Sequence, residues 1–186
     1  QNALPRAYLI HEATAAATLT EAINTLTSPS FTPGKSVLLE QHEVIKYPLL
    51  TTFLTRTADV SRTLENNTVT WEQDTQTAIR LTVEASSDAL LVLTDTYYPG
   101  WHARVDNEPT AIFAANLSKR AIMIPKGVHT VTFFYRPASL FSGLFISAVS
   151  TFLTVLLMIV LRPSGGAHIP KKVPPPVLHH PRIRRR

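Results

Sequence analysis

Cysteine is absent from the chain of 186 residues, so no disulfide can stabilise it. Small secreted domains that cannot build a sufficient hydrophobic core depend on disulfides. The part of the chain that precedes its long apolar run has roughly 130 residues, which is enough to bury a core of its own. The lack of cysteine therefore excludes a disulfide-rich scaffold and is compatible with a location outside the cytoplasm.

Two further absences concern charge. No charged residue occurs from Ala138 to Leu161, over 24 residues, and no acidic residue occurs from Arg162 to the C-terminus. A helix of about 20 apolar residues crosses a bilayer, so we expect a transmembrane helix at 137–161. A helix buried in a protein core is the alternative, but such a helix normally keeps a polar stripe.

The basic residues predict the orientation of this helix. Residues 1–161 contain 11 Lys and Arg against 13 Asp and Glu, whereas residues 162–186 contain 7 Lys and Arg and no acid. Positively charged flanks stay in the cytoplasm. We therefore expect an extracytoplasmic domain at 1–136, the helix at 137–161, and a cytoplasmic tail at 162–186.

The N-terminus lacks the signals that a translocated domain needs. The chain opens with QNALPRAYLI, which has no Met, no basic segment and no long apolar run, and hence no secretory leader. We expect that further sequence precedes Gln1 and that this chain is the C-terminal portion of a longer membrane protein. The missing N-terminal membrane domain would then be its partner.

The tail at 162–186 is rich in Pro, His and Arg and cannot bury a core, so we expect it to be disordered. Its cations would lie next to the inner leaflet, where each attracts anionic lipid by about 1 kcal/mol. Nucleic-acid binding is the alternative for a basic segment, but no aromatic residue is interleaved with these cations. We expect contact with the lipid bilayer and not with nucleic acid.

From Thr68 to Tyr135 the sequence alternates between apolar and polar residues. Turn residues recur about every 8 to 12 positions, which is typical of an antiparallel sandwich or barrel. In AIRLTVEA, one side of the strand carries Ile79, Leu81 and Val83. The run ALLVLTD is apolar enough to be a central strand covered on both faces. Asp106-Asn107 is a predicted hairpin turn, in which Asn accepts the left-handed conformation.

The N-terminal third of the chain is less regular. Strand patterns occur at Pro5–Ala13 and Ser36–Glu40, and a helix is predicted over Thr18–Phe31, with Thr18 or Thr20 as its cap. The Thr-rich stretch at 42–67 is compatible with a strand or an irregular loop. The predicted fold class is mainly β, an antiparallel β-sandwich-like domain with one N-terminal helix.

The stretch LTDTYYPGWHARVDNE places Tyr97, Tyr98 and Trp101 around Pro99-Gly100. Pro and Gly suit the central positions of a type II turn, in which Gly has a positive φ. The tyrosines and Trp101 would then lie on opposite limbs of one bend, and we expect the rings to pack on the sheet. Two alternatives stay open, stacking on a sugar and contact with the missing membrane domain, since Tyr and Trp combine an apolar face with a polar tip.

Other polar residues have structural interpretations. Asp95 and Asp106 resemble an acid pair of the kind that hydrolyses glycosides, but each borders a turn, where Asp accepts backbone hydrogen bonds. His102 and His129 would need a further ligand to form a metal site. We therefore expect no catalytic, cofactor-binding or metal-binding residue in the chain.

The run LLVLTDTYYPGWHARVDNEPTAIFAANLSKRAIMIPKGVHTVTFFYRPASLFSGLFIS resembles the end of the YfhO family of bacterial membrane proteins. That family has a YYPGW turn, a V-D-G hairpin, an AN...RA segment, a P-x-G-x-H-x-V hairpin, Y-x-P and a terminal transmembrane helix. LPRAYLIHEA is similar to its strand that enters this domain. Asn107 replaces the usual Gly, which Asn tolerates because it also accepts positive φ. The basic tail has no counterpart in the family.

The resemblance implies a multi-span, GT-C-like glycosyltransferase of the bacterial cell membrane that uses a polyprenyl-phosphate sugar. The catalytic acidic residue of such enzymes lies in an early extracytoplasmic loop, which this chain does not contain, so no catalytic residue is carried over. We expect a part in glycosylation of a cell-envelope polymer or lipid. The alternative is a non-catalytic, membrane-anchored envelope module that binds carbohydrate, such as an envelope glycan, or a partner protein.

Overall fold

The structure is a computed structural model that describes residues 3–57 and 67–162. The chain forms two compact units, which divide between Ser142 and Gly143. The first unit is rich in β-strands and the second continues the apolar helix. Of the tail predicted at 162–186, all residues after Arg162 lie outside the described residues.

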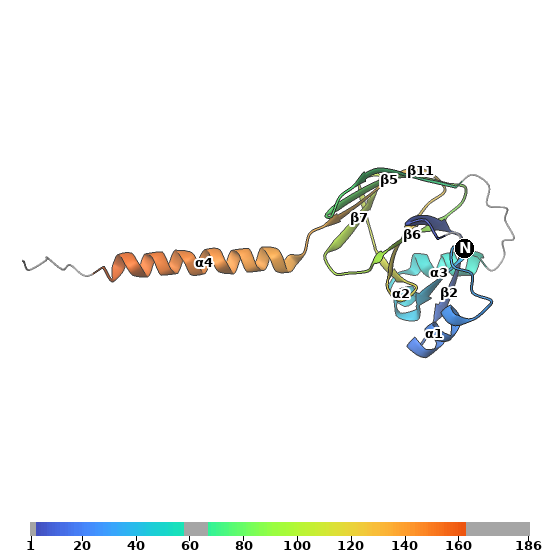
Figure 1. Cartoon of the computed structure of the whole chain (residues 1–186), viewed down its shortest axis with the longest axis horizontal. Helices are drawn as coiled ribbons and strands as arrows, with labels where there is room; N and C mark the ends of the chain where they lie inside the picture. Colours follow the sequence, from blue (N-terminus) through green and yellow to red (C-terminus); the bar gives the residue numbers. More distant parts are fainter. Residues whose placement is uncertain (1–2, 58–66, 163–186) are drawn as a thin grey trace, which may run out of the picture. The chain divides into compact units, whose positions relative to one another are not determined.

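The β-rich unit has two sheets, and the prediction of a mainly β fold is confirmed (Figure 1). The first sheet has six strands in the order β1-β6-β10-β9-β3-β2. These are β1 (Ala7–Ile10), β2 (Glu12–Ala16), β3 (Ser36–Glu40), β6 (Ala89–Thr96), β9 (Phe113–Ala115) and β10 (Lys119–Ile124). The second sheet has the order β4-β5-β11-β7-β8. It consists of β4 (Thr68–Asp74), β5 (Ala78–Ala85), β7 (Trp101–Val105), β8 (Glu108–Thr110) and β11 (Gly127–Tyr135).

One pair of strands departs from the antiparallel pattern. β2 and β3 run parallel, from Glu12 paired with Ser36 to Ala16 paired with Glu40. The helix α1 (Leu19–Thr27) joins them, as parallel neighbours require a crossover connection. The hydroxyl of Thr18 accepts the backbone N–H of Glu21 at 3.1 Å, which confirms the predicted cap.

The prediction of a single N-terminal helix was wrong. The stretch that starts at residue 41 contains two more helices, α2 (Gln41–Lys46) and α3 (Pro48–Thr57). Pro48 occupies the first position of α3, where its missing N–H costs nothing. Leu50 and Phe53 are buried three residues apart against the first sheet. Packing of these side chains outweighs the low helix propensity of the Thr residues.

Two hydrophobic cores lie on either side of the first sheet. The core between the sheets contains Ile79, Leu81 and Val83, as the alternation predicted. A second core lies between the first sheet and the helices α2 and α3. β6 contributes to both, with Leu91 and Leu93 in the first core and Leu90 and Val92 in the second. The prediction of a central strand covered on both faces is confirmed.

His11 stands alone between β1 and β2, which occupy opposite ends of the strand order. Its Nδ1 lies 3.2 Å from the carbonyl oxygen of Asp88 and 3.0 Å from the hydroxyl of Ser87. Its Nε2 lies 2.9 Å from Nδ2 of Asn67, whose Oδ1 accepts the N–H of Ser86. The amide of Asn67 therefore donates to Nε2, and the network assigns a neutral ring with its proton on Nδ1.

Acidification from about pH 7.5 to about pH 5 should destabilise the β-rich unit in part through His11. Burial lowers the pKa of His11 below its usual value of 6.5. The stability that the neutral ring confers is therefore complete above pH 6.5 and is lost as the pH falls through the lower pKa of the folded state. The variant His11→Gln should show a smaller loss of stability over this range in urea denaturation. An identical pH dependence in both proteins would contradict the assignment.

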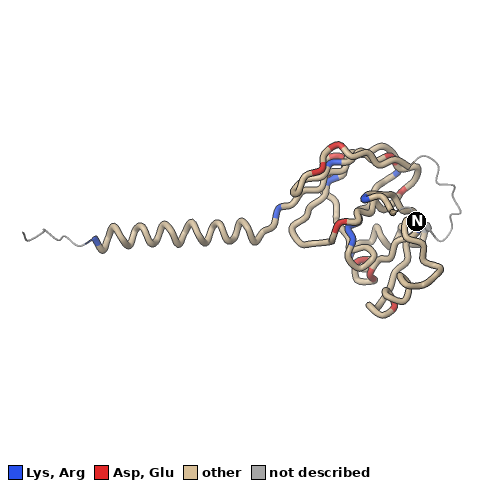
Figure 2. Tube along the Cα trace, in the orientation of Figure 1, with Lys and Arg blue, Asp and Glu red and all other residues tan. Residues whose placement is uncertain are grey.

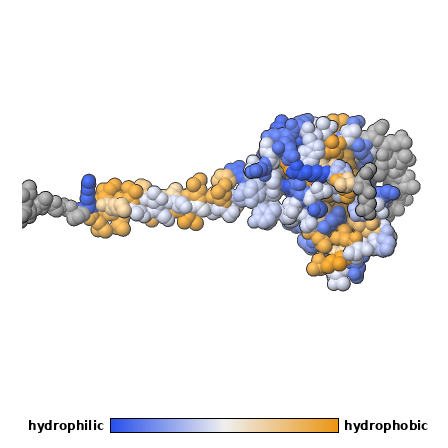
Figure 3. All heavy atoms as spheres, in the orientation of Figure 1, coloured by the Kyte–Doolittle hydropathy of each residue, from blue (hydrophilic) through white to orange (hydrophobic). Residues whose placement is uncertain are grey.

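The described residues include one helix that is long and apolar enough to cross a membrane, α4 (Ala138–Val160). No residue of α4 is buried. Figure 2 shows no charged residue along it, and Figure 3 shows apolar surface on it. These properties are those expected for a transmembrane helix.

Candidate functional site

The aromatic turn connects β6 to β7 and is fixed to two other segments. The φ angle of Gly100 is 101°, in agreement with the predicted type II turn. The carbonyl of Gly100 accepts the backbone N–H of Arg136 at 2.7 Å, and the N–H of Tyr97 donates to the carbonyl of Ser118 at 2.7 Å. The turn is thus held to the segment after β11 and to the β9–β10 loop.

Trp101 is half-buried and packs against the core between the sheets. Its ring centroid lies 5.4 Å from that of Tyr135 on the neighbouring strand β11. The guanidinium carbon of Arg120 lies 4.1 Å from the Trp101 ring. One face of the indole therefore contacts a cation within the unit, in the geometry of a cation–π interaction.

The two tyrosines make different contacts from those of Trp101. The side chain of Tyr97 is 39% exposed, and burial together with the nearby charge of Glu43 on α2 raises its pKa. Tyr98 is 60% exposed and lines a cleft. The structure therefore places Trp101 at the core, Tyr97 near α2 and Tyr98 at the surface, and it does not assemble the three rings into one platform.

A partly buried ionic network is centred on Asp95, at the end of β6 that leads into the turn. Arg120 on β10 is 2% exposed, and its Nη2 donates to Oδ2 of Asp95 on the adjacent strand β6 at 2.7 Å. Arg6 binds the same carboxylate in a bidentate manner, with Nε 2.9 Å from Oδ1 and Nη2 3.0 Å from Oδ2. Nε and Nη1 of Arg120 are buried without a hydrogen-bond partner among the described residues. Asp95 is therefore the counter-ion for two guanidinium groups.

The network also joins the two sheets. Arg6 binds Asp74 on β4 of the second sheet, and its guanidinium lies 4.9 Å from the ring of Trp71 on the same strand. Hydrogen bonding to Arg6 holds the pKa of Asp95 below its usual range, and hydrogen bonding to Asp95 raises that of Arg6. Burial lowers the pKa of Arg120. Asp95 is thus an ionised carboxylate, and both of its oxygens accept hydrogen bonds from arginine.

Sequence reasoning missed this network, although one signal was present. In KRAIMI, Arg120 shares its parity with Ile122 and Ile124, which face the core between the sheets. In a strand, residues two apart point to the same face. A charged residue at such a position predicts a buried ion pair, because a buried charge needs a partner. The identity of the partner could not be read from this pattern.

The second aspartate of the considered acid pair shapes a hairpin. Asp106 and Asn107 have φ angles of 51° and 71°, and the positive φ of Asn107 agrees with the predicted turn. Oδ1 of Asp106 accepts the N–H of Thr130 at 2.8 Å, and Oδ2 lies 2.6 Å from Nδ1 of His129. The hydrogen bond with His129 lowers the pKa of Asp106. A general acid for glycoside cleavage needs a raised pKa, whereas the pKa values of Asp95 and Asp106 are both lowered.

The two histidines considered as metal ligands contact different residues. His102 stacks on Phe134 with ring centroids 5.3 Å apart, whereas His129 binds Asp106. Among residues 3–57 and 67–162 there is no group of three or more His, Cys, Asp and Glu side chains that could hold a metal ion.

A cleft of about 400 Å³ lies between the aromatic turn and the segment that leads into α4. One wall comes from the turn and the start of β7, and the other from the end of β11 and the first residues of α4. Its lining consists of Tyr98, Pro99, Gly100, His102, Tyr135, Arg136, Pro137, Ala138 and Ser139.

Comparison with protein families gives one match. The family described as bacterial membrane protein YfhO matches residues 38–147, which is more than half of the chain. The chain belongs to the YfhO family. Neither a curated protein nor a solved structure matches it.

The range shared with the YfhO family contains most of the residues described above. It begins within β3 and ends within α4, so it includes the aromatic turn, Asp95, Arg120 and the whole cleft. Arg6, β1, β2 and α1 lie outside it. The YfhO match thus includes the end of β11, the start of α4 and the residues that connect them.

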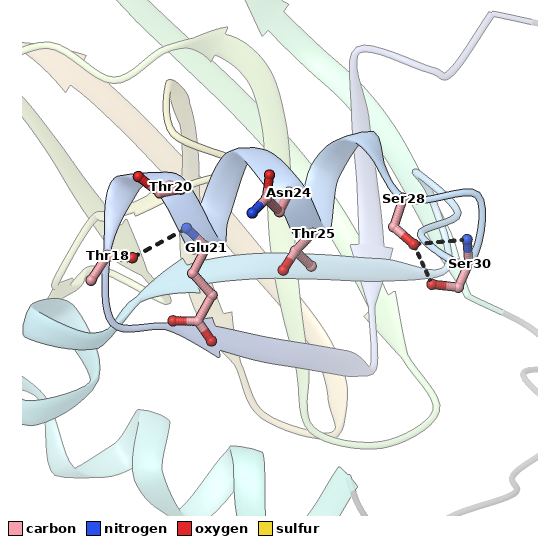
Figure 4. A pocket seen from close by; sticks show the side chains of 7 residues that line it. All are labelled: Thr18, Thr20, Glu21, Asn24, Thr25, Ser28 and Ser30. Carbon is pink, nitrogen blue, oxygen red and sulfur yellow. Dashed lines mark hydrogen bonds between the residues drawn. The ribbon is translucent and has the colours of Figure 1, made fainter.

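A polar depression of about 540 Å³ lies along α1, in a part of the chain outside the range matched by the family (Figure 4). Its side chains make local hydrogen bonds, such as that between Thr18 and the N–H of Glu21 and one of 2.7 Å between the hydroxyls of Ser28 and Ser30. Such bonds are typical of helix ends. The surface is lined by Thr18, Thr20, Glu21, Asn24, Thr25, Ser28 and Ser30, and nothing in these contacts indicates a ligand.

Proposed function

We propose that the chain is the membrane-proximal, extracytoplasmic C-terminal part of a multi-span GT-C-like protein that glycosylates a cell-envelope polymer or lipid. One observation carries this proposal. The YfhO match runs without interruption from β3 through the sandwich and into α4. The β-rich unit and the start of the apolar helix are therefore matched together by the family, as expected for a domain that works at a membrane surface.

The β-rich unit contributes to acceptor handling in this proposal and supplies no catalytic group. Asp95 is neutralised by Arg6 and Arg120, and Asp106 is bound by His129 and the backbone of Thr130. Both carboxylates have lowered pKa values, so they suit a structural role. The exposed Tyr98 is the strongest of the three aromatic candidates for contact with a sugar or a neighbouring domain.

The orientation of the chain is also part of the proposal. The basic residues follow α4 at Arg162 and in the tail, and they favour a cytoplasmic C-terminus. The β-rich unit then lies outside the cytoplasm, on the side where polyprenyl-linked sugars would be transferred to the envelope.

A non-catalytic envelope module is the second candidate function. It is favoured by the cleft, which has an exposed tyrosine and space for a small ligand. In this case the unit would bind carbohydrate or a partner protein and α4 would serve as an anchor.

Disruption of the gene should lower the sugar content of one envelope polymer or lipid, measured by mass spectrometry of envelope extracts. Production of residues 1–186 behind a secretory leader should not restore the sugar, whereas the intact gene should, because Asp95 and Asp106 are both bound within the β-rich unit and neither suits a catalytic acid. Unchanged envelope sugars after disruption would favour the envelope module. Restoration by residues 1–186 alone would show that the chain itself is catalytic.

A further inference from the structure

The cleft beside the aromatic turn contains one strongly basic group, Arg136. Its backbone N–H is used by the carbonyl of Gly100, but its guanidinium has no carboxylate within ion-pair distance among the described residues. This guanidinium lies over the ring of Phe141, 5.0 Å from its centroid. This situation differs from that of Arg6 and Arg120, which both bind Asp95. The hydrogen-bond donors of Arg136 are therefore available to an anion.

The other lining residues suit an anionic ligand. The nine residues of the cleft include no Asp or Glu, so no carboxylate among them repels a negative charge. Tyr98, Tyr135 and Ser139 add hydroxyl groups, and His102 adds a ring nitrogen. A guanidinium binds phosphate through two parallel hydrogen bonds, which a neutral sugar cannot match.

The position of the cleft in the chain indicates the source of the anion. Arg136 is the last charged residue before α4, and the next one is Arg162. Only Pro137 separates Arg136 from the first residue of the helix. If α4 crosses the membrane, the chain at 135–139 must lie at the level of the lipid headgroups, whatever the orientation of the β-rich unit. Tyr and Arg are typical of that level.

We propose that this cleft binds the phosphate group of a membrane phospholipid, with Arg136 as the principal ligand and with Tyr98 and Ser139 as hydroxyl donors. The bound lipid holds the aromatic turn at the membrane surface. The inference rests on the part of the proposed function in which α4 spans the bilayer, and it is independent of glycosyl transfer.

The test uses the full chain in micelles of a polyoxyethylene detergent, which has neither phosphate nor sugar. Short-chain phosphatidylglycerol is titrated in, and the backbone amides of Gly100, His102 and Ser139 are followed by NMR. We expect saturable shifts at these amides. Arg136→Gln should weaken the apparent affinity about tenfold, the effect of losing one charge-assisted pair of hydrogen bonds.

Lys126→Gln is the matched control, because it removes one positive charge at the opposite end of β11. Its affinity should stay within about twofold of the parent. Inorganic phosphate should bind at least about tenfold more weakly than the lipid, since it is not concentrated in the micelle. The corresponding diacylglycerol, which lacks phosphate, should leave the three amides unshifted.

Four outcomes would overturn the proposal. Equal affinity of Arg136→Gln and the parent would remove Arg136 from the site. Equal binding of inorganic phosphate would assign the cleft to a soluble anion, and equal binding of diacylglycerol would make it an apolar contact. Saturable shifts with free N-acetylglucosamine, but not with the phospholipid, would show a sugar site. Loss of envelope glycosylation is measured separately, so failure here leaves the proposed function intact.

Discussion

Replacement of Asp95 with Asn should lower the free energy of unfolding of the β-rich unit by about 3 kcal/mol, because removal of one partner leaves a buried charge uncompensated. Arg120 is 2% exposed, and its guanidinium donates a hydrogen bond to the carboxylate of Asp95. Asn keeps the size of the side chain but loses its charge, so Arg120 loses its counter-ion and Arg6 keeps only Asp74. The value lies at the lower end of the usual range because Asn still accepts one hydrogen bond. Urea denaturation of the full chain in neutral detergent measures it.

Arg120→Met is the informative comparison, since it removes the buried cation itself. The two guanidinium nitrogens without a partner disappear with it, and Asp95 keeps its bidentate contact with Arg6. Replacing buried ionic groups with well-packed apolar ones is often nearly neutral, and Met also makes favourable contacts with an aromatic ring such as Trp101. We expect a cost of about 1 kcal/mol or less. A cost as large as that of Asp95→Asn would contradict the buried-charge explanation.

The acid stability of the unit supplies a second measure of the same effect. Since the pKa of Asp95 is lowered in the folded state, its stabilisation is complete above the unfolded pKa of about 3.9. It is lost as the pH falls through the lower pKa of the folded state. The parent should therefore lose stability in this acidic range, and Asp95→Asn should lose less of it.

The alternation of apolar residues was sufficient to predict a mainly β fold with antiparallel sheets, because burial of one face imposes a period of two on a strand. It identified Ile79, Leu81 and Val83 as core residues and β6 as a central strand. The alternation could not show that β2 and β3 are parallel, since the pairing depends on which edge the chain returns to after α1. Helices α2 and α3 were missed because short segments have weak local preferences and depend on their tertiary contacts, and α3 is also rich in Thr.

The candidate site was predictable only in its local parts. The positive φ of Gly100 and Asn107 follows from turn chemistry, which involves neighbouring residues. The contact of Arg6 with Asp95 joins residues that are 89 positions apart, and no sequence period relates them. The cleft likewise arises where the aromatic turn meets the residues after β11. Such sites require the three-dimensional arrangement of the sheets.

Trp101→Ala should lower the free energy of unfolding by about 3 kcal/mol, as loss of a large aromatic side chain from a core does. The indole is half-buried, packs on the core between the sheets and covers the guanidinium of Arg120. Its loss removes apolar contacts and a cation–π interaction, and it admits water to a buried charge. The strand signal in far-UV circular dichroism reports unfolding without relying on tryptophan fluorescence.

Two variants of the same turn separate packing from ligand binding. Gly100→Ala should also destabilise, because a Cβ atom would lie 2.9 Å from Cε2 of Tyr135 and 3.1 Å from Cα of Pro137, at a φ of 101°. Tyr98→Ala removes an aromatic ring that is 60% exposed, so its effect on stability should stay within about 0.5 kcal/mol. If Trp101→Ala proved as stable as Tyr98→Ala and lost only envelope glycosylation in the complete protein, the indole would be a ligand contact. Because the indole contacts both Arg120 and Tyr135, we expect the opposite order, with Trp101 and Gly100 maintaining the fold and Tyr98 available to bind a ligand.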